Sequence, residues 1–219
     1  MTPPSSLRLG LVVAGLGVWW LTQALLKHRP NGTGRLGDGL HALTAPIFAY
    51  FSARPRAADR LLILSSLLID ALGLFVLIQG VIGPSFRPFL GLVMLFLARQ
   101  ICQALCALPP PEGMIWRSPG FPSLLVTYGV SNDLFFSGHT ALAVYGALEL
   151  GSWGGLAWAL VGAVVALFEI ATVIVLRAHY TMDVFTGAVA AYAAWMAAGA
   201  LAPGVDAALI RWGQTLGLI

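Results

Sequence analysis

The stretch LLILSSLLIDALGLFVLIQGVIG, from Leu61 to Gly83, indicates the fold class of this chain. It contains one charged residue, Asp70, and is long enough to cross a bilayer as a helix, which takes about 20 apolar residues. Comparable apolar stretches occur at 9–26, 89–108, 134–153, 156–176 and 184–201. We therefore expect an all-α integral membrane protein with six transmembrane helices.

The composition supports this class. Of the 219 residues, 58% are hydrophobic and only 10% are charged, which excludes an ordinary soluble domain. The net charge of +3 comes without a basic stripe interleaved with aromatic residues, so we expect no nucleic-acid partner. The first apolar stretch lacks a small-residue cleavage site and is expected to be a retained helix.

No internal repeat or low-complexity linker divides the chain. We expect one membrane domain over residues 1–219, with residues 205–219 forming a helix on the membrane surface. Cys102 and Cys106 lie four residues apart in an apolar helix and are expected to be free thiols. Zinc-site spacings and glycine-rich phosphate loops are missing from the sequence, so we expect neither a metal nor a cofactor.

The long connections lie at residues 27–60 and 109–133, with a short polar turn at 177–183. In a six-helix chain these three connections fall on the same side of the membrane. We therefore expect the active site at one end of the helix bundle, where the helix that carries Arg99 also ends.

Two short polar segments contain the residues most suited to chemistry. One is Ser137-Gly138-His139-Thr140, and the other is His179-Tyr180-Thr181-Met182-Asp183. His179 and Asp183 are four residues apart, which on a helix places both side chains on one face. A carboxylate in this position orients a histidine and raises its basicity.

Each of these residues suits one role in phosphoryl transfer. Ser137 is expected to cap a helix, and Gly138 to let a phosphate approach the helix N-terminus. His139 would donate a proton to the leaving oxygen, and His179 would attack phosphorus. Arg99 would bind phosphate oxygens through its planar fork. The alternatives are a capping or interfacial His139, a structural ion pair between His179 and Asp183, and an Arg99 that extends to the headgroups.

Three sequence segments resemble the sphingomyelin synthase family, within the wider type 2 phosphatidic acid phosphatase (lipid phosphate phosphatase) superfamily. The segments are Asp133-x3-Ser137-Gly138-His139-Thr140, then His179 to Val184, and Arg99-x8-Leu108-Pro109-x-Pro111 followed by Gly113-Met114. The resemblance implies that His179 is the nucleophile, Asp183 its partner and His139 the acid–base catalyst.

The chain also departs from these relatives. Ser131-Asn132 stands where the synthases usually carry Cys-Gly, and Phe136 stands where the phosphatases carry proline. The arginine that the phosphatases place six residues before the nucleophile is Val173 here, and Arg177 is a candidate to replace it in phosphate binding. These departures favour a synthase over a phosphatase and leave the headgroup open.

The expected function is therefore a membrane phosphotransferase with a phosphohistidine intermediate. It would move a phospho-headgroup from a glycerophospholipid donor to a lipid alcohol such as ceramide. If water is the acceptor, the enzyme is a lipid phosphatase or a phospholipase C-type hydrolase. The alternative from another class is a non-catalytic lipid-binding or transport protein. A homo-oligomer is compatible with either.

Headgroup recognition is expected in residues 109–133. Trp116, Phe121 and Tyr128 could form an aromatic cage for a quaternary amine, or alternatively an interfacial aromatic belt. Asp133 could contact an ammonium group or support His139. Tyr180, next to the proposed nucleophile, completes the expected binding residues.

Three acids, Asp70, Glu149 and Glu169, fall within apolar stretches and are either functional or protonated structural groups. His28 and His41 flank an amphipathic segment and are expected to be interfacial.

The loops on the active-site side are rich in Lys and Arg, which by the positive-inside rule places the site in the cytoplasm. The family resemblance instead implies an extracytoplasmic or lumenal site, which we prefer.

Overall fold

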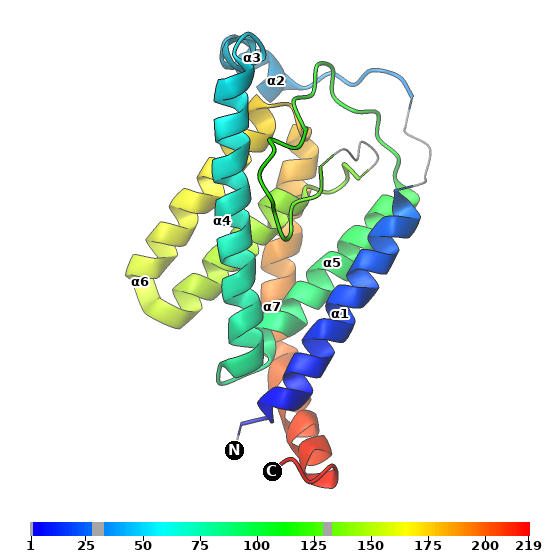
Figure 1. Ribbon diagram of the computed structural model, residues 1–219, viewed down its shortest axis with the longest axis vertical. Coiled ribbons are helices and arrows are strands. Elements are labelled where there is room, and N and C mark those ends of the chain that lie inside the picture. Colours follow the sequence, from blue (N-terminus) through cyan, green and yellow to red (C-terminus); the bar gives the residue numbers. More distant parts are fainter. Residues whose placement is uncertain (1, 28–32, 129–132) are drawn as a thin grey trace.

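The computed structural model describes residues 2–27, 33–128 and 133–219, and all regular structure in these ranges is helical. Five long helices run along the bundle, and two short helices and a long loop cover one of its ends (Figure 1). The helices are α1 (Ser5–Leu26), α2 (Gly39–Leu43), α3 (Ala45–Ser52), α4 (Pro55–Ile82), α5 (Arg87–Leu105), α6 (Gly138–Val175) and α7 (Thr181–Thr215).

In the described ranges, five helices, α1, α4, α5, α6 and α7, are long and apolar enough to cross a membrane. The expectation of six transmembrane helices is not confirmed. The expected helices at 134–153 and 156–176 fall together in α6, which has 38 residues and a non-helical Gly155 with φ 71° and ψ −158°. Glycine adopts this conformation without the penalty a side chain would bring.

The kink at Gly155 turns the second arm of α6 back against the first (Figure 1). The two arms approach closely, because a Cβ on Gly162 would lie 2.6 Å from the Cα of Ala147. At the other end of the chain, a surface helix was expected over residues 205–219; residues 205–215 instead continue α7 past Pro203.

Helix α4 packs against α1, α5 and α6. Its buried residues recur every three to four positions, which produces one continuous buried face. They include Leu62, Ser65, Ile69, Leu72 and Val76. This face packs against α5 and α6, with buried Leu142 and Tyr145 among its surroundings.

Helix α1 is attached mainly through its first turns, where its two buried residues, Arg8 and Val12, lie. The Arg8 guanidinium donates to the carbonyls of Gly80 at 2.8 Å, Gly83 at 2.8 Å and Ser85 at 2.9 Å. Carbonyls at a helix C-terminus lack partners within the helix and favour a cation. Arg8 therefore fixes the start of α1 to the turn between α4 and α5.

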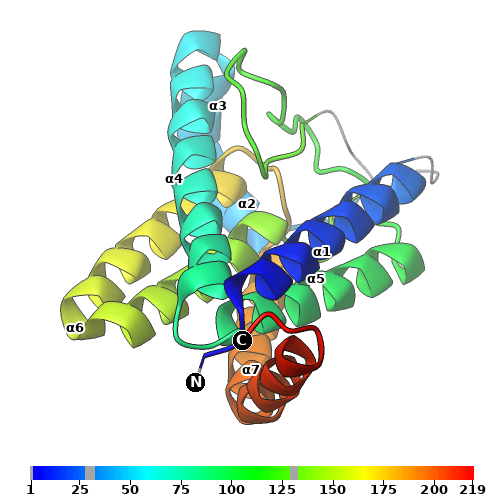
Figure 2. The same ribbon diagram turned by 60° about the horizontal axis from the view of Figure 1, so that its bottom comes forward.

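The three connections expected on one side of the membrane lie together at one end of the bundle (Figure 1). The Ile115 amide donates to the Leu176 carbonyl at 2.9 Å. The Thr181 amide donates to the Asp38 carboxylate at 2.6 Å. Both chain termini lie at the opposite end, where the last turns of α7 come forward in Figure 2.

Candidate functional site

A cavity of about 40 Å³ lies at the loop-covered end of the bundle, between α1, α5, the start of α6 and the turn before α7. We call it the polar cavity, because it contains the charged and imidazole groups expected from the sequence. Its lining consists of Trp19, Gln23, Ile69, Phe96, Arg99, Met114, Trp116, Leu125, Thr127, Asp133, Leu134, Gly138, His139, Leu142, Ala178 and His179.

His179 and Asp183 lie at the start of α7. The distance from His179 Nδ1 to Asp183 Oδ2 is 3.7 Å, too long for a hydrogen bond but within the range of an ion pair. The same carboxylate oxygen accepts a hydrogen bond of 2.9 Å from the Tyr180 amide, which caps the helix. Both residues are buried, so the carboxylate acts on the imidazole away from bulk solvent.

His139 lies in the first turn of α6, which Ser137 caps by accepting a hydrogen bond of 3.3 Å from the Thr140 amide. The Ser137 amide donates to the Asp183 carbonyl at 3.1 Å. This bond connects the two histidine segments. The His139 ring meets Trp116 edge to face, with ring centroids 4.8 Å apart.

Arg99 is buried and holds the segment that precedes α6. Its Nε donates to the Phe136 carbonyl at 2.9 Å, and its Nη2 donates to the Asp133 carbonyl at 2.9 Å. The Asp133 carboxylate lies 3.5 Å from Nη2. Among the described residues Nη1 has no hydrogen-bond partner, and Arg99 lines the polar cavity.

Gly138 lies directly against Arg99. A Cβ on Gly138 would be 3.0 Å from Arg99 Nε. The sequence assigned this glycine to the close approach of a phosphate. In the structure its missing side chain makes room for the guanidinium, next to the free amides of the α6 N-terminus.

Only part of the expected aromatic cage lines the polar cavity. Trp116 does, and its Nε1 donates to the Thr127 carbonyl at 3.1 Å. Tyr128 supports Trp116 from behind, with ring centroids 5.1 Å apart, and its hydroxyl shares a hydrogen bond of 2.6 Å with Ser66. Burial raises the pKa of Tyr128, which keeps its hydroxyl neutral.

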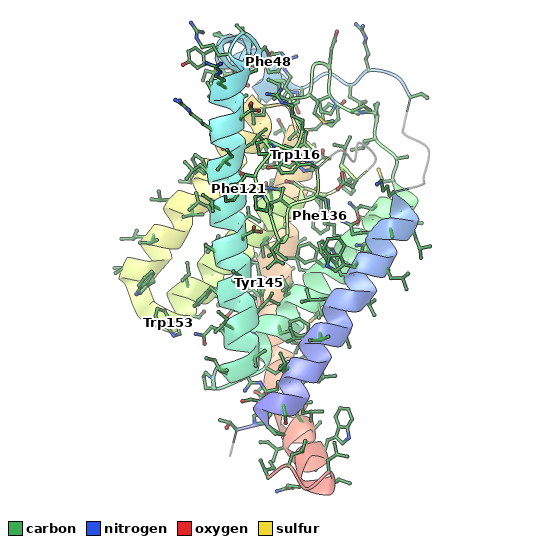
Figure 3. The ribbon with its side chains drawn as sticks, viewed as in Figure 1. Phe48, Trp116, Phe121, Phe136, Tyr145 and Trp153 are labelled. Atoms are coloured by element: carbon green, nitrogen blue, oxygen red, sulfur yellow. The ribbon has the colours of Figure 1, made fainter. Side chains whose placement is uncertain are left out.

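Phe121 is not among the residues that line the polar cavity, whereas Trp19 and Phe96 are. Figure 3 shows Trp116 and Phe136 toward the loop-covered end of the bundle, with Tyr145 and Trp153 farther from it. The Trp and Phe rings that line the cavity come from the loop, α1 and α5.

Two expected binding residues point elsewhere. The Arg177 guanidinium lies 3.9 Å from the centroid of the Phe48 ring, and its Nη1 donates to the Glu112 carbonyl at 2.9 Å. The Tyr180 hydroxyl donates to the Pro109 carbonyl at 3.1 Å. Both residues fix the loops around the polar cavity but do not line it.

His41 and Asp38 are close to the site, although the sequence placed His41 at the membrane interface. His41 is buried, and its Nε2 lies 2.9 Å from the His179 carbonyl. Its ring stacks on Tyr180 at 5.7 Å. The Asp38 carboxylate accepts from the Thr181 amide at 2.6 Å and from the Thr181 hydroxyl at 2.7 Å. The only sequence signal was an aspartate at the start of a short helix, a usual N-cap.

The pKa of Asp38 is lowered. Burial alone would raise it, but hydrogen bonds from Thr181 and from the His41 amide favour the carboxylate and outweigh burial.

The sequence analysis also missed Trp19 and Gln23 of α1, for which a glutamine in an apolar helix was the only signal. His28, Ser131 and Asn132 lie outside the described residues.

The three acids in the helices do not line the polar cavity. Asp70 accepts from the Leu124 amide at 2.8 Å and the Leu125 amide at 2.9 Å, which anchors the loop. Glu169 accepts from Ser65 at 2.6 Å, and Glu149 accepts from Arg87 at 2.7 Å.

Cys102 and Cys106 are free thiols. Within residues 2–27, 33–128 and 133–219, no cluster of three His, Cys, Asp or Glu side chains could hold a metal ion.

Comparison with known proteins identifies the family. The family model described as AtPDCT1/2 matches residues 38–200, which is more than half of the 219-residue chain. No curated protein and no solved structure matches the chain.

This match corrects the resemblance drawn from the histidine motifs. The expected membership of the sphingomyelin synthase family and the phosphatidic acid phosphatase superfamily is wrong, because the matching family is that of the phosphatidylcholine:diacylglycerol cholinephosphotransferases. Headgroup transfer between lipids, which was expected from the histidine motifs, agrees with this family, whereas the match does not support ceramide as the acceptor. The expected side of the membrane stays a prediction. The chain belongs to the AtPDCT1/2 family and is a membrane phosphotransferase that acts on lipids.

Proposed function

We propose that this protein transfers phosphocholine from phosphatidylcholine to diacylglycerol through a covalent intermediate on His179. The observation that carries the proposal is that His139, His179 and Arg99 all line the polar cavity. The family match supplies the two lipids.

In the first half-reaction, His179 attacks the phosphorus of phosphatidylcholine. Nδ1 faces Asp183, so Nε2 is the nitrogen available for attack. A phosphorus–nitrogen bond forms, and the bond between phosphorus and the glycerol oxygen breaks. His139 gives its proton to the departing oxygen, because an alkoxide is a poor leaving group without a proton donor. The products are diacylglycerol and phosphocholine attached to His179.

The second half-reaction is the reverse with a different diacylglycerol. Its hydroxyl gives a proton to His139 and attacks phosphorus, and the phosphorus–nitrogen bond breaks. One phosphodiester replaces another, so the bonds broken and formed are equivalent and the exchange needs no other energy source. The same histidine serves as acid and base in turn.

Two groups can stabilise the negative charge on the transferring phosphorus. One is Nη1 of Arg99, and the other is the set of amides at the start of α6. The Trp116 ring can attract the choline ammonium. Since His179 is only 6% exposed, the intermediate is shielded from water, which favours transfer over hydrolysis.

The test uses purified protein in liposomes that contain headgroup-labelled phosphatidylcholine and a diacylglycerol with distinguishable acyl chains. We expect labelled phosphatidylcholine with the new acyl chains. His179→Ala and His139→Ala should each lower the rate by about a thousandfold or more. The matched control is Arg211→Ala, an exposed position near the end of α7.

A second measurement omits the diacylglycerol. The label should remain on the protein, and His179→Ala should remove it. Undiminished transfer by His179→Ala would refute the covalent mechanism. Release of free phosphocholine as the main product would identify the protein as a hydrolase.

A further inference from the structure

A second cavity, of about 60 Å³, lies between α1, α4 and α5. We call it the apolar groove, because every residue that lines it is aliphatic, aromatic or glycine. It borders the polar cavity, since Trp19, Phe96, Leu125 and Leu142 line both. Trp19 of α1 and Phe96 of α5 meet edge to face at this border, with ring centroids 6.1 Å apart.

The apolar groove extends along the helices, away from the polar cavity. On α5 its lining runs from Phe89 to Phe96, and Arg99 of the polar cavity follows one turn later. A helical stretch of this length spans about 10 Å. Polar and apolar surroundings therefore follow one another along the bundle, in the order of the headgroup and the acyl chain of a lipid.

The groove is partly open at the surface of the helix bundle. Val93 lines it and is 40% exposed. On the other wall, α1 is fixed at Arg8, whereas its later residues Leu16 and Trp19 are only partly buried. A groove with this lining, between helices that are apolar enough to cross a membrane, suits a hydrocarbon chain.

We propose that the apolar groove binds one acyl chain of the glycerophospholipid donor and thereby places its phosphodiester in the polar cavity. The identity of the lipid rests on the proposed function. After transfer, the same groove holds the chain of the diacylglycerol product until it leaves between α1 and α5.

The first experiment tests binding without catalysis. The His179→Ala protein is placed in phosphatidylcholine nanodiscs that contain phosphatidylcholine with a diazirine in one acyl chain, irradiated and digested. We expect labelled peptides from residues 12–23 and 89–96. Leu16→Trp fills the groove and should remove most of this label. Val18→Trp, on the 61% exposed side of α1, is the matched control and should retain it.

The second experiment measures transfer by protein that keeps His179. Leu16→Trp should lower kcat/KM about tenfold for long-chain phosphatidylcholine and much less for the dihexanoyl lipid, whose short chains gain little from the groove. Val93→Phe fills the groove from the α5 side and should give the same chain-length dependence. Because two variants on different helices are compared, a folding defect in one of them does not decide the result.

Label that persists in the groove peptides of Leu16→Trp, or equal losses for long and short chains in both variants, would overturn the groove proposal. Groove label in a protein whose unsubstituted form transfers no phosphocholine would overturn the proposed function and leave the acyl-chain site standing.

Discussion

His41 Nε2 lies 2.9 Å from the backbone carbonyl of His179, across 138 positions of sequence. A carbonyl only accepts, so the imidazole donates through Nε2. Together with Asp38, which holds Thr181, this bond fixes the turn that carries the proposed nucleophile. His41 is a positioning residue, because it contacts the backbone of His179 and does not line the polar cavity.

Replacing His41 by alanine should lower kcat about tenfold, since a small displacement of a reacting group is costly, and should change KM little. Glutamine places an amide nitrogen near the position of Nε2, so His41→Gln should restore most of the rate. Initial rates of phosphocholine transfer at several phosphatidylcholine contents separate kcat from KM. Equal losses in both variants would show that packing on Tyr180, rather than the hydrogen bond, is what the turn requires.

The hydrogen bonds between the Asp38 carboxylate and Thr181 hold this turn in place only while the carboxylate is ionised, so the stability of the turn depends on pH. Because the pKa of Asp38 in the folded protein is below its ordinary value of 3.8, its stabilising contribution is complete above pH 3.8 and is lost as the pH falls through the lowered value. Hydrogen exchange of the peptide at residues 179–183 is the measurement. Asp38→Ala should exchange faster than the unsubstituted protein between about pH 5 and 7, and the difference should vanish under more acidic conditions. A constant difference at every pH would contradict this role.

The sequence predicted the helical segments well, because long apolar stretches leave the backbone few alternatives in a bilayer. It also separated two helical stretches at residues 153–156, where the backbone of α6 leaves helical geometry at Gly155 and the second arm turns back.

The motifs named the candidate residues of the site, and the three connections on one side of the membrane predicted that they gather at one end of the bundle. His139, His179 and Arg99 line one cavity at that end, although their roles stay predictions. The position of His41 depends on Asp38 binding Thr181, a contact between residues 143 positions apart that no local pattern encodes. The contribution of α1 through Trp19 was missed for the same reason, because the face a membrane helix turns inward depends on its neighbours.

Arg99 should not tolerate lysine. Lysine keeps the charge but replaces the planar guanidinium, whose Nε and Nη2 donate separately to the Phe136 and Asp133 carbonyls, by a single nitrogen. Arg99→Lys should lose about 1–3 kcal/mol of unfolding free energy and most of the transfer activity. Thermal unfolding in detergent and the transfer assay measure the two effects, with the exposed Arg211→Lys as control. Full activity in Arg99→Lys would show that charge alone suffices.

Gly187 sets the distance between α7 and the start of α6. A Cβ on Gly187 would lie 2.8 Å from the Ser137 carbonyl oxygen, a backbone atom that cannot move without shifting the first turn of α6. Gly187→Ala should therefore cost about 1–3 kcal/mol of stability and lower kcat, because it separates His139 from His179. Gly199→Ala, on the same helix with nothing within 4 Å of the added Cβ, is the matched control and should be neutral or stabilising by up to about 1 kcal/mol. If both variants unfold at the same temperature and transfer phosphocholine equally fast, the close contact between α6 and α7 does not position the two histidines.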